Sequence, residues 1–220
     1  MDARQGMIAE IEREVRETRA HLGKDLLDPR VLAALARVPR HAFVPPEFEA
    51  EAYVNAPLPI GHGQTISQPY VVAVMTDLIA PEPGHSVLEI GTGCGYQTAV
   101  LAELVERVYS VEVIPELADA ARARLARLGY LNVEVKTGNG RMGWPEHAPY
   151  DGIVVTAAAR EIPAPLLDQL KPGGRMAVPV GSRMGGQDLL LVMKGESGRI
   201  DERVILPVAF VPLVKGGRLA

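Results

Sequence analysis

The stretch that decides the fold reads VLEIGTGCGY, from Val87 to Tyr96. Four mostly apolar residues predict a buried strand, the glycine-spaced segment predicts a tight turn, and an apolar helical pattern follows. Glycines leave no side chains in the way, so backbone N–H groups at the start of the helix can approach a ligand closely. The stretch therefore predicts a nucleotide-binding turn between a strand and a helix.

Strands and helices alternate along the chain after this turn. Continuous apolar strands that alternate with helices are typical of an α/β fold with a doubly wound, mostly parallel sheet covered on both faces. Two apolar segments near the C-terminus predict one or two antiparallel strands added to that sheet. The expected strands are Ser86–Ile90, Arg107–Glu112, Val133–Thr137, Asp151–Thr156, Arg175–Val180, Asp188–Met193 and Arg203–Pro212; the expected helices are Tyr96–Leu104, Pro115–Leu128 and Ile162–Leu170.

A helical cap is expected before this core. One amphipathic helix is predicted to run through Leu22, a second to begin at Asp28-Pro29, and another to follow Ser67. Between the last two, a loop rich in proline and glycine is expected from Arg40 to Gly63. We expect a single domain over residues 1–220, with a helical cap and substrate loop over 1–80 and a cofactor-binding α/β core over 81–220.

The composition excludes several classes of protein. The 220 residues are 23% charged and 47% hydrophobic, as in ordinary globular proteins, and the net charge of −4 offers no basic field for nucleic acid or an anionic membrane. The apolar runs are too short to span a bilayer, and the N-terminal segment lacks an apolar stretch, so we expect a cytoplasmic monomer. The single cysteine, Cys94, excludes an intrachain disulfide, and the scattered histidines show no metal-ligand spacing.

The spacing of the glycines distinguishes between nucleotides. Gly91, Gly93 and Gly95 lie two residues apart, whereas a dinucleotide fingerprint would place its third glycine at Tyr96. A carboxylate at Glu89 would repel a pyrophosphate but could accept hydrogen bonds from an ammonium group or ordered waters. The turn therefore favours a nucleoside with a cationic amino-acid tail, S-adenosyl-L-methionine, over NAD.

Two further positions are expected to contact this cofactor. Glu112 ends the second strand, 21 residues after Gly91, where an acid can accept both ribose hydroxyls. The loop after the third strand contains Asn139 and Gly140, at the place where an adenine would lie. Asn139 can accept a hydrogen bond from the adenine amino group, although Asn-Gly is also an ordinary turn.

Several motifs together resemble the protein-L-isoaspartate O-methyltransferase family. They are GHGQTISQPY (61–70), VLEIGTGCGYQTAVLA (87–102), GNGRMGW (138–144), APYDGIVVTAAA (148–159) and QLKPGGRMAVPVG (169–181), and the resemblance runs from Val38 to Leu213. It implies a Rossmann-like, class I S-adenosylmethionine-dependent methyltransferase. Its expected reaction transfers a methyl group to the α-carboxylate of L-isoaspartyl residues in damaged proteins and peptides, with S-adenosyl-L-homocysteine as the other product. The ester then collapses to a succinimide, which partly reopens as normal aspartate.

Three residues depart from the family pattern. The family usually has aspartate where this chain has Asn139 and Asn55, and often threonine where it has Val214. Asn139 keeps an acceptor but loses the charge, so weaker cofactor binding is expected. For Asn55, contact with substrate and control of loop geometry are both open. The Asn139-Gly140 pair is also prone to deamidation.

The segment GHGQTISQPY is interpreted as a lid over the methyl donor. Gln64, Thr65, Ile66 and Ser67 are expected to face the cofactor, and His62, Thr65 and Ala157 the substrate. The attacking carboxylate is already ionised at neutral pH, so the transfer needs a positioning group rather than a general base. The active-site serine of the family aligns with Ser67, yet Ser67 could equally be the N-cap of the helix that follows.

Two other functions are compatible with the same motifs. One is a methyltransferase that acts on a small-molecule carboxylate or hydroxyl. The other is a weakly active module that binds S-adenosylmethionine, suggested by the three departures.

Overall fold

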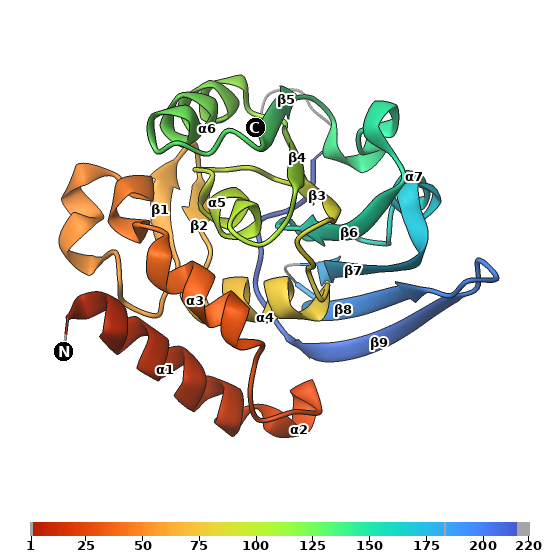
Figure 1. Cartoon of the computed structure of the whole chain (residues 1–220), viewed down its shortest axis with the longest axis horizontal. Helices are drawn as coiled ribbons and strands as arrows, with labels where there is room; N and C mark the ends of the chain where they lie inside the picture. Colours follow the sequence, from red (N-terminus) through yellow and green to blue (C-terminus); the bar gives the residue numbers. More distant parts are fainter. Residues whose placement is uncertain (1, 183, 215–220) are drawn as a thin grey trace.

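A seven-stranded sheet forms the centre of the molecule in the computed structural model, which describes residues 2–182 and 184–214 (Figure 1). The strand order is β5-β4-β3-β6-β7-β8-β9. Neighbours from β5 to β7 pair in parallel, and β7, β8 and β9 pair antiparallel. The expected parallel sheet and its antiparallel tail are thus confirmed, and the tail has two strands. The bounds are β3 (Ser86–Ile90), β4 (Arg107–Glu112), β5 (Val133–Thr137), β6 (Tyr150–Val155), β7 (Leu170–Ser182), β8 (Gly186–Lys194) and β9 (Ile200–Pro207).

The path of the chain creates a switch point between β3 and β6. From β3 it moves outward through α5 (Tyr96–Ala102) to β4 and through α6 (Pro115–Arg127) to β5. It then returns to β6, on the other side of β3, and continues through α7 (Ala164–Gln169) to β7. Ligands of open parallel sheets bind beyond the carboxyl ends of the strands at such a point.

The two faces of the sheet bury separate hydrophobic cores. In β3, Val87 belongs to one core and Leu88 and Ile90 to the other, and each is at most 1% exposed. This alternation follows the two-residue period of a strand whose two faces are both covered. The central strands are therefore rigid supports for the loops at their carboxyl ends.

The N-terminal helices differ in detail from the sequence prediction. The helix expected to run through Leu22 is divided at Thr18 into α1 (Ala3–Glu17) and α2 (Arg19–Leu22). The helix expected at Asp28-Pro29 is confirmed as α3 (Pro29–Arg37), and the one after Ser67 as α4 (Pro69–Leu78). No helix among the described residues is long and apolar enough to cross a membrane.

The expected loop from Arg40 to Gly63 proves to contain ordered structure. It forms two 3₁₀ helices, η1 (Arg40–Phe43) and η2 (Pro46–Glu51), and the strand β1 (Leu58–Gly61). β1 pairs antiparallel with β2 (Gln64–Ile66), so the first half of GHGQTISQPY is a hairpin. The loop prediction was wrong here because segments of three to six residues are too short to show a periodic pattern. Two further 3₁₀ helices, η3 (Gly140–Met142) and η4 (Pro145–His147), lie between β5 and β6.

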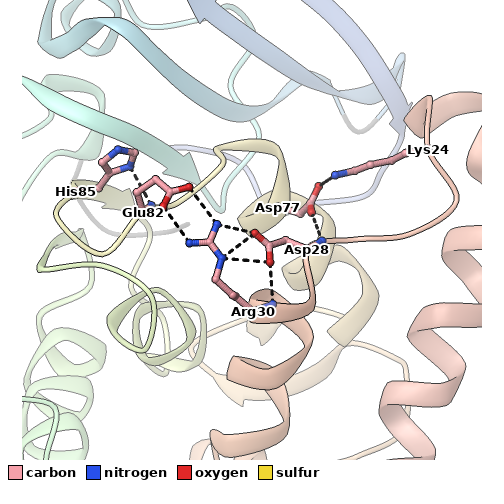
Figure 2. A network of polar contacts seen from close by, with 6 residues as sticks. All are labelled: Lys24, Asp28, Arg30, Asp77, Glu82 and His85. Carbon is pink, nitrogen blue, oxygen red and sulfur yellow. Dashed lines mark hydrogen bonds and ion pairs between the residues drawn. The ribbon is translucent and has the colours of Figure 1, made fainter.

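A polar network attaches the helical region to the loop before β3 (Figure 2). Asp77, at the end of α4, is almost fully buried; it forms an ion pair with Lys24 and accepts a hydrogen bond from the Asp28 backbone N–H at 2.7 Å. Arg30 bridges Asp28 and Glu82, with N···O distances of 2.7 and 3.0 Å, and lowers the pKa of both carboxyls. Asp77 thus ties the segment before α3 to the end of α4, and the exposed pair of Arg30 and Glu82 reaches the loop before β3.

Candidate active site

A cavity lies at the carboxyl ends of β3, β4 and β6. Its walls come from segments that are far apart in the sequence: the hairpin residues Gln64–Ser67, the turn Gly91–Cys94, Val111–Ile114 after β4, and Val211–Val214 near the C-terminus. The other lining residues are Val72, Ile90, Tyr96, Gln97, Gly140, Thr156 and Ala157. This is the position that the switch point between β3 and β6 dictates.

The backbone of the glycine turn, residues 91–94, borders the cavity. Gly91 has φ +96°, and a Cβ atom there would collide with the Thr156 hydroxyl, which itself donates to the Gly91 carbonyl at 2.6 Å. Gly93 lines the cavity with φ +53°. Gly95 lies outside the described lining; a Cβ atom there would meet Leu125 of α6 at 3.2 Å. Gly91 and Gly93 therefore line the cavity with backbone atoms, and Gly95 allows close packing of α5 against α6.

Glu112 presents a carboxylate to the cavity from the end of β4. Its Oε2 accepts from the Gly93 N–H at 2.8 Å, and its Oε1 from Val113 and Ile114 at 2.9 and 3.0 Å. These backbone bonds fix the carboxylate while leaving further lone pairs for a ligand. These carboxylate oxygens can accept hydrogen bonds from the hydroxyl groups of a ribose.

The lining as a whole fits S-adenosylmethionine. Ile90, Val111, Ile114 and Leu213 offer apolar surface for a planar base, and Glu112 offers acceptors for the sugar. The backbone of the glycine turn and the hairpin residues provide polar groups for the amino-acid tail. Such mostly apolar walls with a few fixed polar groups are typical of cofactor sites.

The structure tests the capping interpretation of Ser67. The N-cap of α4 is Gln68, and this helix has no hydrogen bond from the side chain of its N-cap. Instead, Asn55 Oδ1 accepts from the Tyr70 N–H at 2.9 Å. Among the described residues the Ser67 hydroxyl has no hydrogen-bond partner, and it lines the cavity. The capping interpretation of Ser67 is therefore wrong.

A second cavity adjoins the first at Ser67. The two share Thr65, Ser67, Thr156 and Val211 as lining residues. The second continues between the start of α4 and the segment Leu206–Val211. Ser67 thus lies on the boundary between the two cavities.

Arg40 is a site residue that the sequence analysis missed. Its side chain is fully buried; Nε donates to the Ala52 carbonyl and Nη2 to the Ser67 carbonyl, both at 2.8 Å. The guanidinium lies 4.6 Å from the ring centroid of Tyr96, which lines the cavity. Burial lowers the pKa of Arg40, and no carboxylate among the described residues pairs with it. Arg40 holds the Ser67 backbone against the start of α5, a long-range contact that no local motif signals.

The departure at Asn55 has a structural explanation. Asn55 Nδ2 donates to Glu14 Oε2 at 2.7 Å, and Gln68 Nε2 donates to the same oxygen at 3.1 Å. With its Oδ1 on the Tyr70 N–H, Asn55 ties α1 to the start of α4. Asn55 therefore controls loop geometry, and an amide suits the neighbouring carboxylate better than an aspartate would.

Glu89 is not among the described residues that line the cavity. It is fully buried, and Thr98 and Ser110 hydroxyls both donate to its Oε2 at 2.5 Å while Oε1 has no partner. Burial raises the pKa of Glu89 to about 8. The expectation of direct cofactor contact is not supported, because the side chain is bound between Thr98 of α5 and Ser110 of β4 and is absent from the cavity lining.

Asn139 and His62 also lie outside the described lining of both cavities. Asn139 Oδ1 accepts from the Arg141 N–H at 3.1 Å and caps η3, as the turn interpretation expects. His62 occupies the exposed hairpin turn with φ +53°. The other predicted residues, Gln64, Thr65, Ile66, Ser67, Gly91, Gly93, Glu112, Gly140 and Ala157, do line the first cavity, as does Val214.

The switch-point cavity, the glycine turn and the fixed carboxylate after β4 define a Rossmann-like S-adenosylmethionine-dependent methyltransferase. Comparisons with known proteins give the family. The sequence profile of the family Protein-L-isoaspartate(D-aspartate) O-methyltransferase (PCMT) matches residues 16–218. The chain therefore belongs to this family, and it is a methyltransferase that acts on isoaspartyl residues of proteins in their repair.

Individual relatives agree with this assignment. The chain is 62% identical to Protein-L-isoaspartate O-methyltransferase 2 of Syntrophobacter fumaroxidans, over 97% of this chain and 87% of that one. It is 59% identical to Protein-L-isoaspartate O-methyltransferase 2 of a Polaromonas species, over 94% and 98%. A solved protein-L-isoaspartate O-methyltransferase has a TM-score of 0.83 at 28% identity, covering 97% of this chain and 67% of its own. A Plasmodium falciparum structure in complex with S-adenosyl-L-homocysteine, at 22% identity and TM-score 0.79, shares the fold and covers 98% of this chain and all of its own.

Proposed function

We propose that Ser67 orients the α-carboxylate of an L-isoaspartyl residue for attack on the methyl group of bound S-adenosylmethionine. The observation that carries this assignment is the Ser67 hydroxyl on the boundary of the two cavities, which has no hydrogen-bond partner in the part of the chain that the structure describes. From there it can donate to one carboxylate oxygen and leave the other free. The backbone of Ser67 is held by Arg40, so the hydroxyl is placed before substrate arrives.

The methyl transfer requires a correctly positioned carboxylate rather than a proton transfer. The substrate carboxylate is ionised at neutral pH, so one of its oxygens can take the methyl group in line as the sulfonium becomes a neutral thioether. Thr65 and Ala157 line the same wall and would contact the isoaspartyl chain, while exclusion of water strengthens the attraction between anion and sulfonium. The methyl ester then closes to a succinimide with loss of methanol, and hydrolysis partly restores aspartate.

The cofactor is assigned to the lining residues of the first cavity. Glu112 would accept the ribose hydroxyls, Gly91 and Gly93 would offer backbone to the amino-acid tail, and Gly140 would border the base. The hairpin residues Gln64–Ser67 would cover the methyl donor from the other side. Glu89, Asn139 and His62 would act on these groups indirectly.

Labelled methyl transfer to an isoaspartyl peptide, beside its aspartyl twin, tests this function. We expect label on the isoaspartyl peptide alone, and no label on free small carboxylates. Ser67→Ala should lower kcat by about 10- to 100-fold, as expected for the loss of one hydrogen bond to a charged group, with S-adenosyl-L-homocysteine affinity nearly unchanged. Ser197→Ala, at an exposed turn, is the matched control. Unchanged turnover in Ser67→Ala would remove the positioning role.

We also propose that residues 1–220 act as one domain, in a cytoplasmic monomer that binds neither nucleic acid nor membranes. The hydrophobic core shared by α1, α3, α4 and the sheet supports the single domain. The net charge of −4 supports the absence of polyanion binding, and S-adenosylmethionine is an intracellular metabolite. Light scattering, a single unfolding transition and cell fractionation are the corresponding tests.

A further inference from the structure

We propose that Glu14 selects substrates by charge, favouring a basic side chain beside the isoaspartyl residue and disfavouring an acidic one. Glu14 lies in α1, far from the cofactor turn in sequence, yet it lines the second cavity together with Ser67. The inference rests on the proposed placement of the substrate carboxylate at Ser67, because that placement puts the neighbouring residues of the peptide in the second cavity.

Glu14 is the one charged side chain among the described residues that line this cavity. Its hydrogen-bond donors, Asn55 Nδ2 and Gln68 Nε2, are uncharged amides. No cation among the described residues forms an ion pair with it. The Glu14 carboxylate therefore has no neutralising cation beside it among the described residues, and its field acts on whatever enters the second cavity.

The two amides also fix the position of the charge. Gln68 directly follows Ser67, and Asn55 is bound to the backbone of Tyr70 at the start of α4. The carboxylate of Glu14 is therefore tied to the segment that orients the substrate and is half-buried, where solvent screens a charge less than at the open surface. The remaining described lining residues, such as Pro57, Val71 and Phe210, are apolar or neutral and offer no competing charge.

Isoaspartyl peptides that differ in one neighbour test the proposal. Lysine, glutamate or glutamine is placed immediately before or immediately after the isoaspartyl residue, with no other charged side chain. For the wild-type protein we expect kcat/KM to be about three- to tenfold higher with lysine than with glutamate on at least one side, and this ratio to fall as salt is raised.

Glu14→Gln is the decisive variant. Both amides donate to Oε2, at 2.7 and 3.1 Å, so a glutamine oxygen at that place can keep both bonds. The ratio should fall to about one in this variant, because the rate with the lysine peptide falls toward that with the glutamine peptide and the rate with the glutamate peptide rises toward it. Glu10→Gln removes the same charge from an exposed position one helical turn earlier and should leave the ratio unchanged.

Three outcomes would overturn the proposal: no preference in the wild-type protein, a preference kept by Glu14→Gln, or an equal loss in Glu10→Gln. The salt dependence of the wild-type ratio needs no variant and gives an independent test. The glutamine peptide reports the reaction itself, and Ser67→Ala reports the placement of the carboxylate. Failure of the charge preference is thus distinguishable from failure of the proposed site.

Discussion

Replacing Glu89 by glutamine tests how a buried carboxyl group below the cofactor turn affects stability. Burial raises its pKa from 4.5 to about 8. A group whose pKa is raised by folding holds its proton more tightly in the folded protein, so its stabilisation is fully present below pH 4.5 and is lost as the pH rises to about 8. At about 1.4 kcal/mol per pH unit, the loss approaches 5 kcal/mol above pH 8, with about half reached by pH 6.

Glutamine reproduces the protonated acid without its titration. Its oxygen can accept from Thr98 and Ser110 as Oε2 does, and its NH₂ group would take the place of Oε1, which has no partner. Glu89→Gln and the wild-type protein should therefore agree within about 1 kcal/mol near pH 5. Above pH 8 the variant should be more stable by about 2–5 kcal/mol.

Urea unfolding at a series of pH values from 5 to 9 measures the free energy of unfolding directly. The difference between the variant and the wild-type protein should grow across this range. Glu106→Gln, at an exposed position just before β4, removes a carboxylate without burial and should run parallel to the wild-type protein. If the free energies of unfolding of Glu89→Gln and the wild-type protein changed with pH in parallel, Glu89 would not change its protonation state, and the reasoning would be refuted.

Three other substitutions follow from the contacts around Ser67 and the cofactor cavity. Arg40→Lys keeps the charge but cannot reach both bound carbonyls, so kcat should fall by about tenfold or more while S-adenosyl-L-homocysteine affinity, measured by calorimetry, falls less. Asn55→Asp places a carboxylate against Glu14 and should destabilise the protein by about 1–3 kcal/mol at pH 7. Like charges raise the pKa of such a pair, so thermal unfolding should show the lost stability returning as the pH falls toward 4. Glu112→Gln sets an NH₂ group against backbone N–H groups and should weaken S-adenosyl-L-homocysteine binding by about 10- to 100-fold, again read by calorimetry; unchanged affinity would contradict the ribose assignment.

Local patterns in the sequence predicted much of the fold and one wall of the site. The apolar strands from Ser86 to Val180, the glycine turn and the carboxylate at Glu112 are all continuous segments with their own hydrophobic period or turn chemistry. They were predicted with small errors at their ends, such as the shorter helix α7 and the earlier start of β7. Short elements with no period, above all the hairpin β1–β2, were missed.

The sequence by itself determined the doubly wound sheet, the type of cofactor and the family, because these depend on residues that are neighbours along the chain. Only the tertiary structure decided what each side chain of the site touches. It showed that Asn55, rather than Ser67, satisfies the start of α4, that Arg40 holds the Ser67 backbone, and that Glu14 lines the second cavity together with Ser67. The bonds from Asn55 to Tyr70 and from Arg40 to Ser67 join residues 15 and 27 positions apart, and Glu14 binds Gln68 across 54 positions. The energies of these contacts depend on burial and geometry that exist only after the chain has packed.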